Sequence, residues 1–224
     1  ENTLEGIKAA LRHKDGVEVD VQISKDETVW LSHSAEVIGC NQKFKCFPES
    51  LDSEIISITT CNGVDISYTQ LEDVYRFVRD SFPSAPICID LKGWFPCSGN
   101  SLDIEGMMRR EAKRVVELAE KYGLENNTLI ETETSSVLSY VRSINKHVPT
   151  YQTVHGDFER GMLICLNYGY TGMSFKTNIG ETLDRDKVDM MHRKGLKMMV
   201  WNLTNMDEAK TMVDLGVDYI QIDL

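Results

Sequence analysis

The sequence predicts an α/β fold in which parallel strands, each followed by a helix, close into a (β/α)8 barrel. Short apolar runs alternate with amphipathic stretches of about ten to twenty residues, which is the pattern of parallel βαβ units. Seven such steps fit in 224 residues, close to the roughly 250 residues of a typical barrel. An open doubly wound sheet usually carries a Gly-rich phosphate loop after its first strand, and this sequence has none.

The first expected element is a helix over residues 2–13. It opens with Asn2 and carries Glu5 three positions later, which is the spacing of a capping box, and apolar residues follow at helical spacing. Two short strands come next, at residues 16–23 and 28–33, with a polar turn between them. The second of these runs is expected to be a hairpin partner and not a barrel strand.

Residues 34–68 are expected to form a long irregular loop inserted into the barrel, because they hold a proline and three of the six cysteines. Beyond this insertion, helices and strands alternate to the end. No Pro- or Ser-rich linker interrupts them, so residues 1–224 are expected to form one domain. The expected helices are 71–82, 103–123, 135–147, 157–169, 184–195 and 205–216, and the strands are 86–93, 128–132, 149–154, 172–175, 196–203 and 218–224.

The charge balance limits the classes of partner. Lys and Arg number 24 and Asp and Glu number 35, which gives a net charge of −11. This charge argues against a nucleic-acid groove, because phosphate backbones need clustered basic residues. A small anionic substrate would need a local cation, either a metal ion or a few placed basic side chains. No apolar run approaches the roughly 18 residues that a membrane span requires.

The cysteines leave the compartment open. Cys88 and Cys165 lie in apolar runs and are expected to be buried free thiols, which favours the cytoplasm. Cys40 and Cys46 bracket a short loop and could pair in an oxidising compartment, so a secreted or periplasmic protein is also compatible. A zinc site formed by these two cysteines and His33 is disfavoured, because the spacing fits no zinc-finger pattern. The sequence does not indicate the oligomeric state.

The barrel rule separates the five histidines, because barrel chemistry takes place at the carboxyl ends of the strands. His33 and His155 follow strands and are expected at that edge, where they could act as acid or base. His13, His147 and His192 close helices before the next strand. Their expected role is a favourable interaction with a helix C-terminus.

Acidic residues interrupt two of the expected strands. Glu18 and Asp20 share one face of the first strand, because residues two apart on a strand point to the same side. Asp90 and Lys92 repeat this arrangement in the next barrel strand. Carboxylates that converge at a barrel mouth favour a hard divalent cation, Mg²⁺ or Ca²⁺. The alternatives are solvated strand ends or a salt bridge to Lys92.

Four segments resemble, in order along the chain, the motifs of the glycerophosphodiester phosphodiesterase family, which has a PI-PLC-like fold. They are ENTLEGIKAAL, GVEVDVQISKDETVWLSH, IDLK and VWNLTNMDEAKTMVDLGVDYIQID. The resemblance implies a (β/α)8 TIM barrel that uses one divalent cation to hydrolyse a phosphodiester to an alcohol and glycerol 3-phosphate. The cation and a basic residue would lower the repulsion that a nucleophile meets, and a histidine would protonate the leaving alkoxide.

The resemblance also implies roles for individual residues of this chain. Metal ligands would be Glu18, Asp20 and Asp90, His33 would be one of two acid/base histidines, Lys92 would face the phosphate, and Trp201 would line the pocket. His155, at the same edge, is a further candidate for contact with substrate and the first alternative to His33 as acid or base.

The chain departs from the family pattern at several positions. Ser34 follows His33 where the family usually has Asp, and Asp90 stands where the family usually has Glu. The segment IETET lacks the usual Ser-Phe pair. The family's other catalytic histidine belongs to a His-Arg-Gly motif upstream of ENT. We therefore expect about ten to twenty further residues before Glu1, enough for a first strand and its loop.

Two other functions stay open at this point. The departures are compatible with a catalytically weakened barrel that binds a phosphodiester or a polyol without hydrolysing it. A phospholipase D-like enzyme acting on phospholipid head groups is the second alternative. An exposed apolar rim around Phe44 and Phe47, in the inserted loop, would indicate that enzyme.

Overall fold

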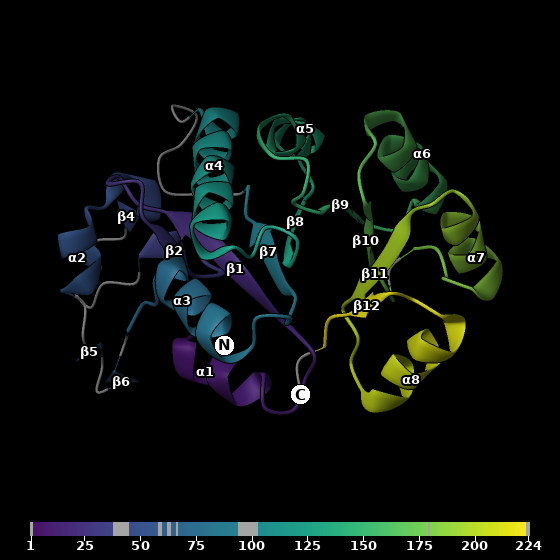
Figure 1. The fold of residues 1–224 in the computed structure, drawn as a ribbon, viewed down its shortest axis with the longest axis horizontal. Helices are drawn as coiled ribbons and strands as arrows, with labels where there is room; N and C mark the ends of the chain where they lie inside the picture. Colours follow the sequence, from purple (N-terminus) through teal and green to yellow (C-terminus); the bar gives the residue numbers. More distant parts are fainter. Residues whose placement is uncertain are drawn as a thin grey trace.

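The central feature of the fold is one curled sheet with helices around its outer face (Figure 1). The computed structural model describes residues 2–37, 45–57, 60, 61, 64, 65, 67–93, 103–178 and 180–222. The sheet has the strand order β12-β11-β10-β9-β8-β7-β1-β2. Neighbouring strands are parallel except for β2, which runs antiparallel to β1 as a hairpin partner.

The main elements lie close to their expected ranges. The sheet strands are β1 (Val17–Ile23), β2 (Val29–Leu31), β7 (Ile87–Leu91), β8 (Thr128–Thr132), β9 (Thr150–Val154), β10 (Gly172–Lys176), β11 (Lys197–Trp201) and β12 (Tyr219–Ile220). The helices around them are α1 (Leu4–Ala10), α3 (Leu71–Ser81), α4 (Ile104–Tyr122), α5 (Ser135–Ile144), α6 (Phe158–Tyr168), α7 (Arg185–Arg193) and α8 (Met206–Leu215). This α/β alternation confirms the predicted fold class.

The inserted segment is more ordered than expected. Its described parts form β3 (Glu36–Val37), β4 (Lys45–Cys46), the 3-10 helix η1 (Phe47–Glu49), α2 (Asp52–Ile56), β5 (Thr60–Cys61) and β6 (Val64–Asp65). The Asp52 carboxylate fastens α2 to the β1–β2 hairpin, because it accepts hydrogen bonds from the Ser24 and Thr28 hydroxyls and the Trp30 indole. These elements are too short to show a hydrophobic period, so the sequence did not reveal them.

The start of α1 also differs from the expectation. The N-cap is Thr3, whose side chain accepts a hydrogen bond from the Gly6 amide. Asn2 does not cap the helix, because its side-chain amide bonds to Asp20 on β1 instead. Glu5 forms an exposed pair with Lys8. The first helix is therefore tied to the sheet at its first residues.

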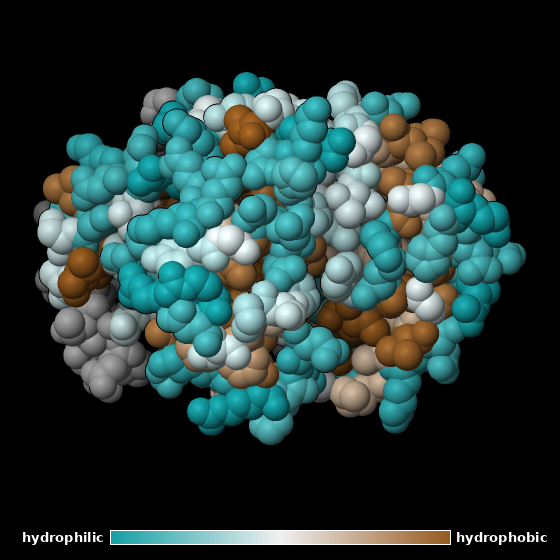
Figure 2. Space-filling model, viewed as in Figure 1, coloured by the Kyte–Doolittle hydropathy of each residue, from teal (hydrophilic) through white to brown (hydrophobic). Residues whose placement is uncertain are grey.

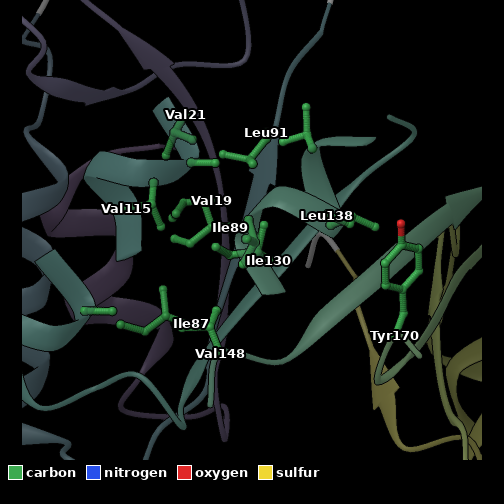
Figure 3. Packing of buried hydrophobic residues seen from close by; sticks show 14 of the residues in the cluster. Val19, Val21, Ile87, Ile89, Leu91, Val115, Ile130, Leu138, Val148 and Tyr170 are labelled. Carbon is green, nitrogen blue, oxygen red and sulfur yellow. The ribbon is translucent and has the colours of Figure 1, made fainter. Parts of the chain in front are cut away.

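The sheet has an outer face, which packs against the helices, and an inner face, and alternate residues of each strand point to one or the other. Val19 and Val21 of β1 and Ile89 of β7 belong to the main hydrophobic core beneath the helices (Figure 3). The residues between them point to the inner face, because side chains alternate along a strand. A second, small cluster that includes Cys88 and Tyr151 fills part of this inner face. The acidic residues of β1 and β7 therefore point away from the helices.

The cysteines follow part of the expectation. Cys88 and Cys165 are buried free thiols, as expected. Cys46 is buried and disulfide-bonded, so its sulfur is unavailable to zinc. Cys40, its expected partner, lies outside the described residues.

No helix in the described part of the chain is both long and apolar enough to span a bilayer. The face of the molecule in Figure 2 is mainly hydrophilic with separate apolar spots.

Candidate active site

Four carboxylates converge on the inner face of β1, β7 and β8. Asp20 of β1 pairs in register with Asp90 of β7, and Asp90 pairs in register with Glu131 of β8. Carboxylate oxygens of Glu18, Asp90 and Glu131 all lie within 4.8 Å of one another. The sheet therefore brings together, at one place, acids from three neighbouring strands.

Asp20 lies beside this group and is held by two other side chains. The Lys92 ammonium is 2.7 Å from Asp20 Oδ1 and also contacts Asp90 Oδ2. On the other side, Asn2 Nδ2 donates to Asp20 Oδ2 at 2.8 Å, and Asn2 Oδ1 accepts from the Asp20 amide at 3.0 Å. The salt bridge that the sequence offered as an alternative therefore forms, and it joins two of the predicted ligands.

The electrostatics show that negative charge is in excess here. Crowding by surrounding protein and then three nearby carboxylates raise the pKa of Glu18 to about 9, although its side chain as a whole is exposed. Burial and then Glu131 raise the pKa of Asp90 to about 7, against the opposing effect of Lys92. Burial alone would lower the pKa of Lys92, but Asp90 and Asp20 raise it. Clustered hard oxygen donors with too little positive charge fit Mg²⁺ or Ca²⁺.

Glu131 is the acid that sequence reasoning missed. Its side chain is 3% exposed, and Oε1 accepts hydrogen bonds from Gln221 Nε2 at 2.6 Å and from the Cys88 thiol at 3.4 Å. The signal was present in the run TLIET. An acid inside a short apolar strand, at the same end as Asp90, follows the pattern that identified Asp90 itself.

His33 lies just after β2, in a segment that is hydrogen-bonded to the backbone of Asp20. The amide of Ser32 donates to the Asp20 carbonyl at 3.0 Å, which fastens this segment to β1. The His33 side chain is exposed, so it is accessible to a substrate. Ser34, where the family usually has Asp, accepts a hydrogen bond from the Glu36 amide at 3.2 Å. A serine hydroxyl can thus supply the local turn that a carboxylate would supply.

A second group lies at the carboxyl ends of β9, β10 and β11. His155 Nε2 is 2.6 Å from Glu133 Oε1, and the His155 ring meets the edge of Trp201 with centroids 5.3 Å apart. Lys176 Nζ lies 4.6 Å from the Trp201 ring centroid. Two of the three residues predicted to contact substrate, His155 and Trp201, are therefore neighbours, and Lys176 lies next to Trp201.

His192 and His147 were assigned to the edge of the sheet where the strands begin, and both lie next to strand starts. His192 Nε2 is 2.9 Å from Asp218 Oδ2, next to the start of β11. The backbone amide of His147 donates to the Asn145 side chain just before β9. Both histidines precede strands, as expected, and the interaction of their rings with a helix C-terminus stays a prediction.

The sequence as a whole matches known proteins. A model of the glycerophosphoryl diester phosphodiesterase family matches residues 1–223. Lysophospholipase D GDPD1 of Mus musculus is 26% identical over 98% of this chain and 79% of its own length. Lysophospholipase D GDPD3 of Homo sapiens is 25% identical over 77% of this chain and 51% of its own length.

Solved structures show the same fold at low identity. A phosphodiesterase of Oleispira antarctica, in complex with the product sn-glycerol-3-phosphate, has a TM-score of 0.78 at 14% identity, covering 98% of this chain and 86% of that one. Glycerophosphodiester phosphodiesterase of Thermotoga maritima has a TM-score of 0.72 at 18% identity, covering 98% and 87%. The family match spans nearly every residue, so this chain belongs to the glycerophosphoryl diester phosphodiesterase family and is a phosphoric diester hydrolase.

Proposed function

We propose that this protein hydrolyses glycerophosphodiesters to an alcohol and glycerol 3-phosphate with one divalent cation, Mg²⁺ or Ca²⁺. The observation that carries the proposal is that carboxylate oxygens of Glu18, Asp90 and Glu131, on β1, β7 and β8, lie within 4.8 Å of one another. The product named for the Oleispira antarctica neighbour is the one expected here.

The carboxylates have the role of holding the cation. Glu18, Asp90 and Glu131 are the proposed central ligands, and Asp20, which lies beside this group in contact with Lys92, is a further proposed ligand. When bound, the cation supplies positive charge to the phosphodiester and makes a bound water more acidic. Lys92, which already contacts Asp20 and Asp90, adds a second positive charge next to the phosphate oxygens.

His33 is the proposed proton donor for the leaving alkoxide. Imidazole can gain and lose a proton near neutral pH, which suits it to this task. The bond from Ser32 to the Asp20 carbonyl supports the assignment, because it keeps the His33 segment next to a proposed metal ligand. His155 has a carboxylate partner in Glu133 and is assigned to substrate contact together with Trp201.

A lysophospholipid substrate is the second candidate. Both curated relatives are named as lysophospholipases D. Two apolar side chains of the inserted segment are exposed, Leu51 at 39% and Ile56 at 60%. Phe47, which the sequence offered as part of an apolar rim, is instead fully buried against Tyr68, and Phe44 lies outside the described residues. Phe47 therefore does not contribute to an exposed apolar rim.

The test measures release of the alcohol, glycerol or choline, from glycerophosphoglycerol, glycerophosphocholine and lysophosphatidylcholine by the complete natural protein. The other product is glycerol 3-phosphate from the first two substrates and a lysophosphatidic acid from the third. A chelator should abolish release, and MgCl2 or CaCl2 should restore it. Asp90→Asn should lower activity by more than roughly 100-fold, since even outer partners of metal ligands are worth 10–100-fold. Asp214→Asn, on the exposed face of α8, is the matched control and should change nothing.

Turnover that survives both the chelator and Asp90→Asn would contradict the proposal. Absence of turnover with every diester, combined with intact cation binding, would favour a barrel that binds phosphodiesters without hydrolysing them. Preference for lysophosphatidylcholine over both glycerophosphodiesters would favour the second candidate.

A further inference from the structure

The inner face of β9, β10 and β11 holds buried polar atoms that have no partner among the described residues. They are Thr153 Oγ1, Ser174 Oγ and Trp201 Nε1. Thr153 and Ser174 are paired in register on neighbouring strands. A buried donor that is left unpaired costs about 1–3 kcal/mol, so such atoms in a functional site indicate a ligand or water that pairs with them.

Strand alternation places these atoms on the same face as the carboxylates. Phe175 and Val200 belong to the core beneath the helices. Ser174 and Trp201 are their neighbours along β10 and β11, so they point the opposite way. Met199, which pairs in register with Ser174, belongs to the inner cluster that also holds Cys88. The unpaired atoms therefore lie on the inner face, to one side of the acidic group.

Lys176 brings a positive charge to this region without an acidic partner. In the part of the chain that the structure describes, no carboxylate lies within 4.0 Å of its ammonium. Lys176 pairs in register with Trp201, and its Nζ lies 4.6 Å from the centroid of that ring. The charge of Lys176 is thus held on an aromatic face and remains available to an anionic or hydroxyl-bearing ligand.

We propose that Thr153, Ser174, Lys176 and Trp201 form the subsite for one ester arm of the substrate, and that this arm is a hydroxyl-rich or anionic alcohol. The inference rests on the proposed function, whose substrate class it narrows. The indole N–H and the ammonium can only donate, and the two hydroxyls can donate or accept. The complementary group therefore carries acceptors, such as polyol hydroxyls or a carboxylate.

The same subsite discriminates against a quaternary ammonium. A trimethylammonium group offers no hydrogen-bond acceptor and leaves the buried donors unpaired. It would normally bind on an aromatic face, but Lys176 occupies a face of Trp201 and His155 packs at an angle of 85° to the ring. The positive charge of Lys176 repels it further.

The experiment compares kcat/KM for glycerophosphoglycerol, glycerophosphoserine and glycerophosphocholine in the complete natural protein with the cation present. The first two substrates should exceed the third by at least about 10-fold, the equivalent of one lost buried hydrogen bond. Lys176→Met should reduce this ratio by raising relative activity on glycerophosphocholine. Ser174→Ala should lower kcat/KM for glycerophosphoglycerol without lowering the melting temperature, because it removes only an unpaired hydroxyl.

Lys194→Met is the matched control, because Lys194 is exposed at the end of α7, at the opposite edge of the sheet, and should leave the ratio unchanged. A wild-type preference for glycerophosphocholine would overturn the inference, as would an equal loss on all three substrates in Lys176→Met. If no diester is hydrolysed, the proposed function fails. The subsite is then tested separately by calorimetric dissociation constants of the same three compounds. Glycerophosphoglycerol and glycerophosphoserine should bind at least about 10-fold more tightly than glycerophosphocholine.

Discussion

The two halves of the inner sheet face differ in charge although their outer faces are alike. On β1, β7 and β8 the inner positions carry four carboxylates, and Lys92 is the one basic side chain that the described residues bring into contact with them. On β9, β10 and β11 they carry an indole, two hydroxyls and the Lys176 ammonium, and among the described residues the hydroxyls have no hydrogen-bond partner and Lys176 has no carboxylate partner. Both halves bury apolar side chains against the helices, mainly Val, Ile and Leu in the first half and Val, Phe and Met in the second.

This contrast shows that the outer positions of each strand serve the fold while alternate inner positions are free to serve chemistry. The carboxylates of the acidic half need a positive charge to balance them, and the unpaired donors of the second half need hydrogen-bond acceptors. A phosphodiester with a hydroxyl-bearing arm meets both needs once a cation is bound. The function proposed for the molecule follows from the pairing of these two halves.

The largest expected effect concerns His33, which flanks the acidic half. His33→Ala should lower kcat by about 10²–10⁴-fold, because a positioned general acid typically contributes that much. Cation binding and the melting temperature should stay unchanged, since the side chain is exposed. Steady-state kinetics and thermal unfolding measure the two properties separately.

His13→Ala is the matched control for this variant, because His13 is exposed beyond α1 and precedes β1. Near-normal turnover in His33→Ala would move the acid/base role to the other half of the face. His155 would then be the next residue to substitute.

The sequence predicted the alternation of strands and helices, because parallel strands buried on one face and amphipathic helices both leave clear periods. It also placed Glu18 and Asp90 at the same edge, because strand parity follows from residue numbers alone. The order of the inserted segment was not predictable. It depends on Asp52 meeting hydroxyls and an indole from a hairpin more than 20 positions away.

The second half of the site was harder to predict for a physical reason. Lysine and serine are ordinary residue types at a strand end. Ser174 stands out because its buried hydroxyl has no hydrogen-bond partner among the described residues, and Lys176 because it lies on the Trp201 ring and not on a carboxylate. A sequence shows which groups are present but not which of them lack partners. The regrouping of Asp20 with Lys92 and Asn2 likewise depends on three-dimensional distances.

A second prediction concerns the pH dependence of stability. Glu18, with its pKa raised to about 9, and Asp90, with its pKa raised to about 7, keep protons in the folded metal-free protein that the unfolded chain has released. Their stabilising contribution is complete below the ordinary carboxyl pKa and is lost as pH rises through the folded values. With a chelator present, the melting temperature should therefore fall between pH 5 and pH 9.

MgCl2 or CaCl2 should reverse this loss, with a larger increase in melting temperature at pH 8.5 than at pH 5.5. The Glu18→Gln variant should show a flatter profile and a smaller response to the cation. An increase in melting temperature of equal size at both pH values would indicate that the cation does not bind at Glu18 and Asp90.

A smaller effect is expected at Glu111, which lies on the inner side of α4 behind the acidic half. Its side chain is fully buried, and neither carboxylate oxygen has a partner among the described residues. Burial and then Asp90 hold its pKa well above the ordinary value. Glu111→Met should stabilise the protein by about 1–3 kcal/mol at pH 7, because an unpaired polar group is removed at similar volume.

The gain in Glu111→Met should shrink as pH falls from 7 toward 4.5 and should be smallest below pH 4.5, where the unfolded wild type is also protonated. Chemical denaturation at pH 4 and pH 7 measures both values. Glu120→Met, at an exposed position of the same helix, is the control. A destabilised Glu111→Met variant with normal packing would indicate that the buried acid has a partner in solution.

The smallest effect on activity is expected at Asp218, at the edge opposite the site. Burial alone would raise its pKa, but hydrogen bonds from Lys197, the Met198 amide and His192 outweigh burial and lower it. Asp218→Asn should cost about 1 kcal/mol of folding stability at neutral pH. The loss should diminish as pH falls through the pKa of Asp218. kcat/KM should not change, and a large change would contradict the division between the two edges of the sheet.

The most direct test of the central claim is calorimetric titration of the chelator-treated natural protein with MgCl2 and with CaCl2. The structure predicts one bound cation per chain for at least one of the two salts. Its affinity should fall by more than roughly 100-fold in Asp90→Asn and stay unchanged in Asp214→Asn. Absence of binding for both salts in the wild type, or equal binding in Asp90→Asn, would contradict a cation site on the acidic half of the sheet.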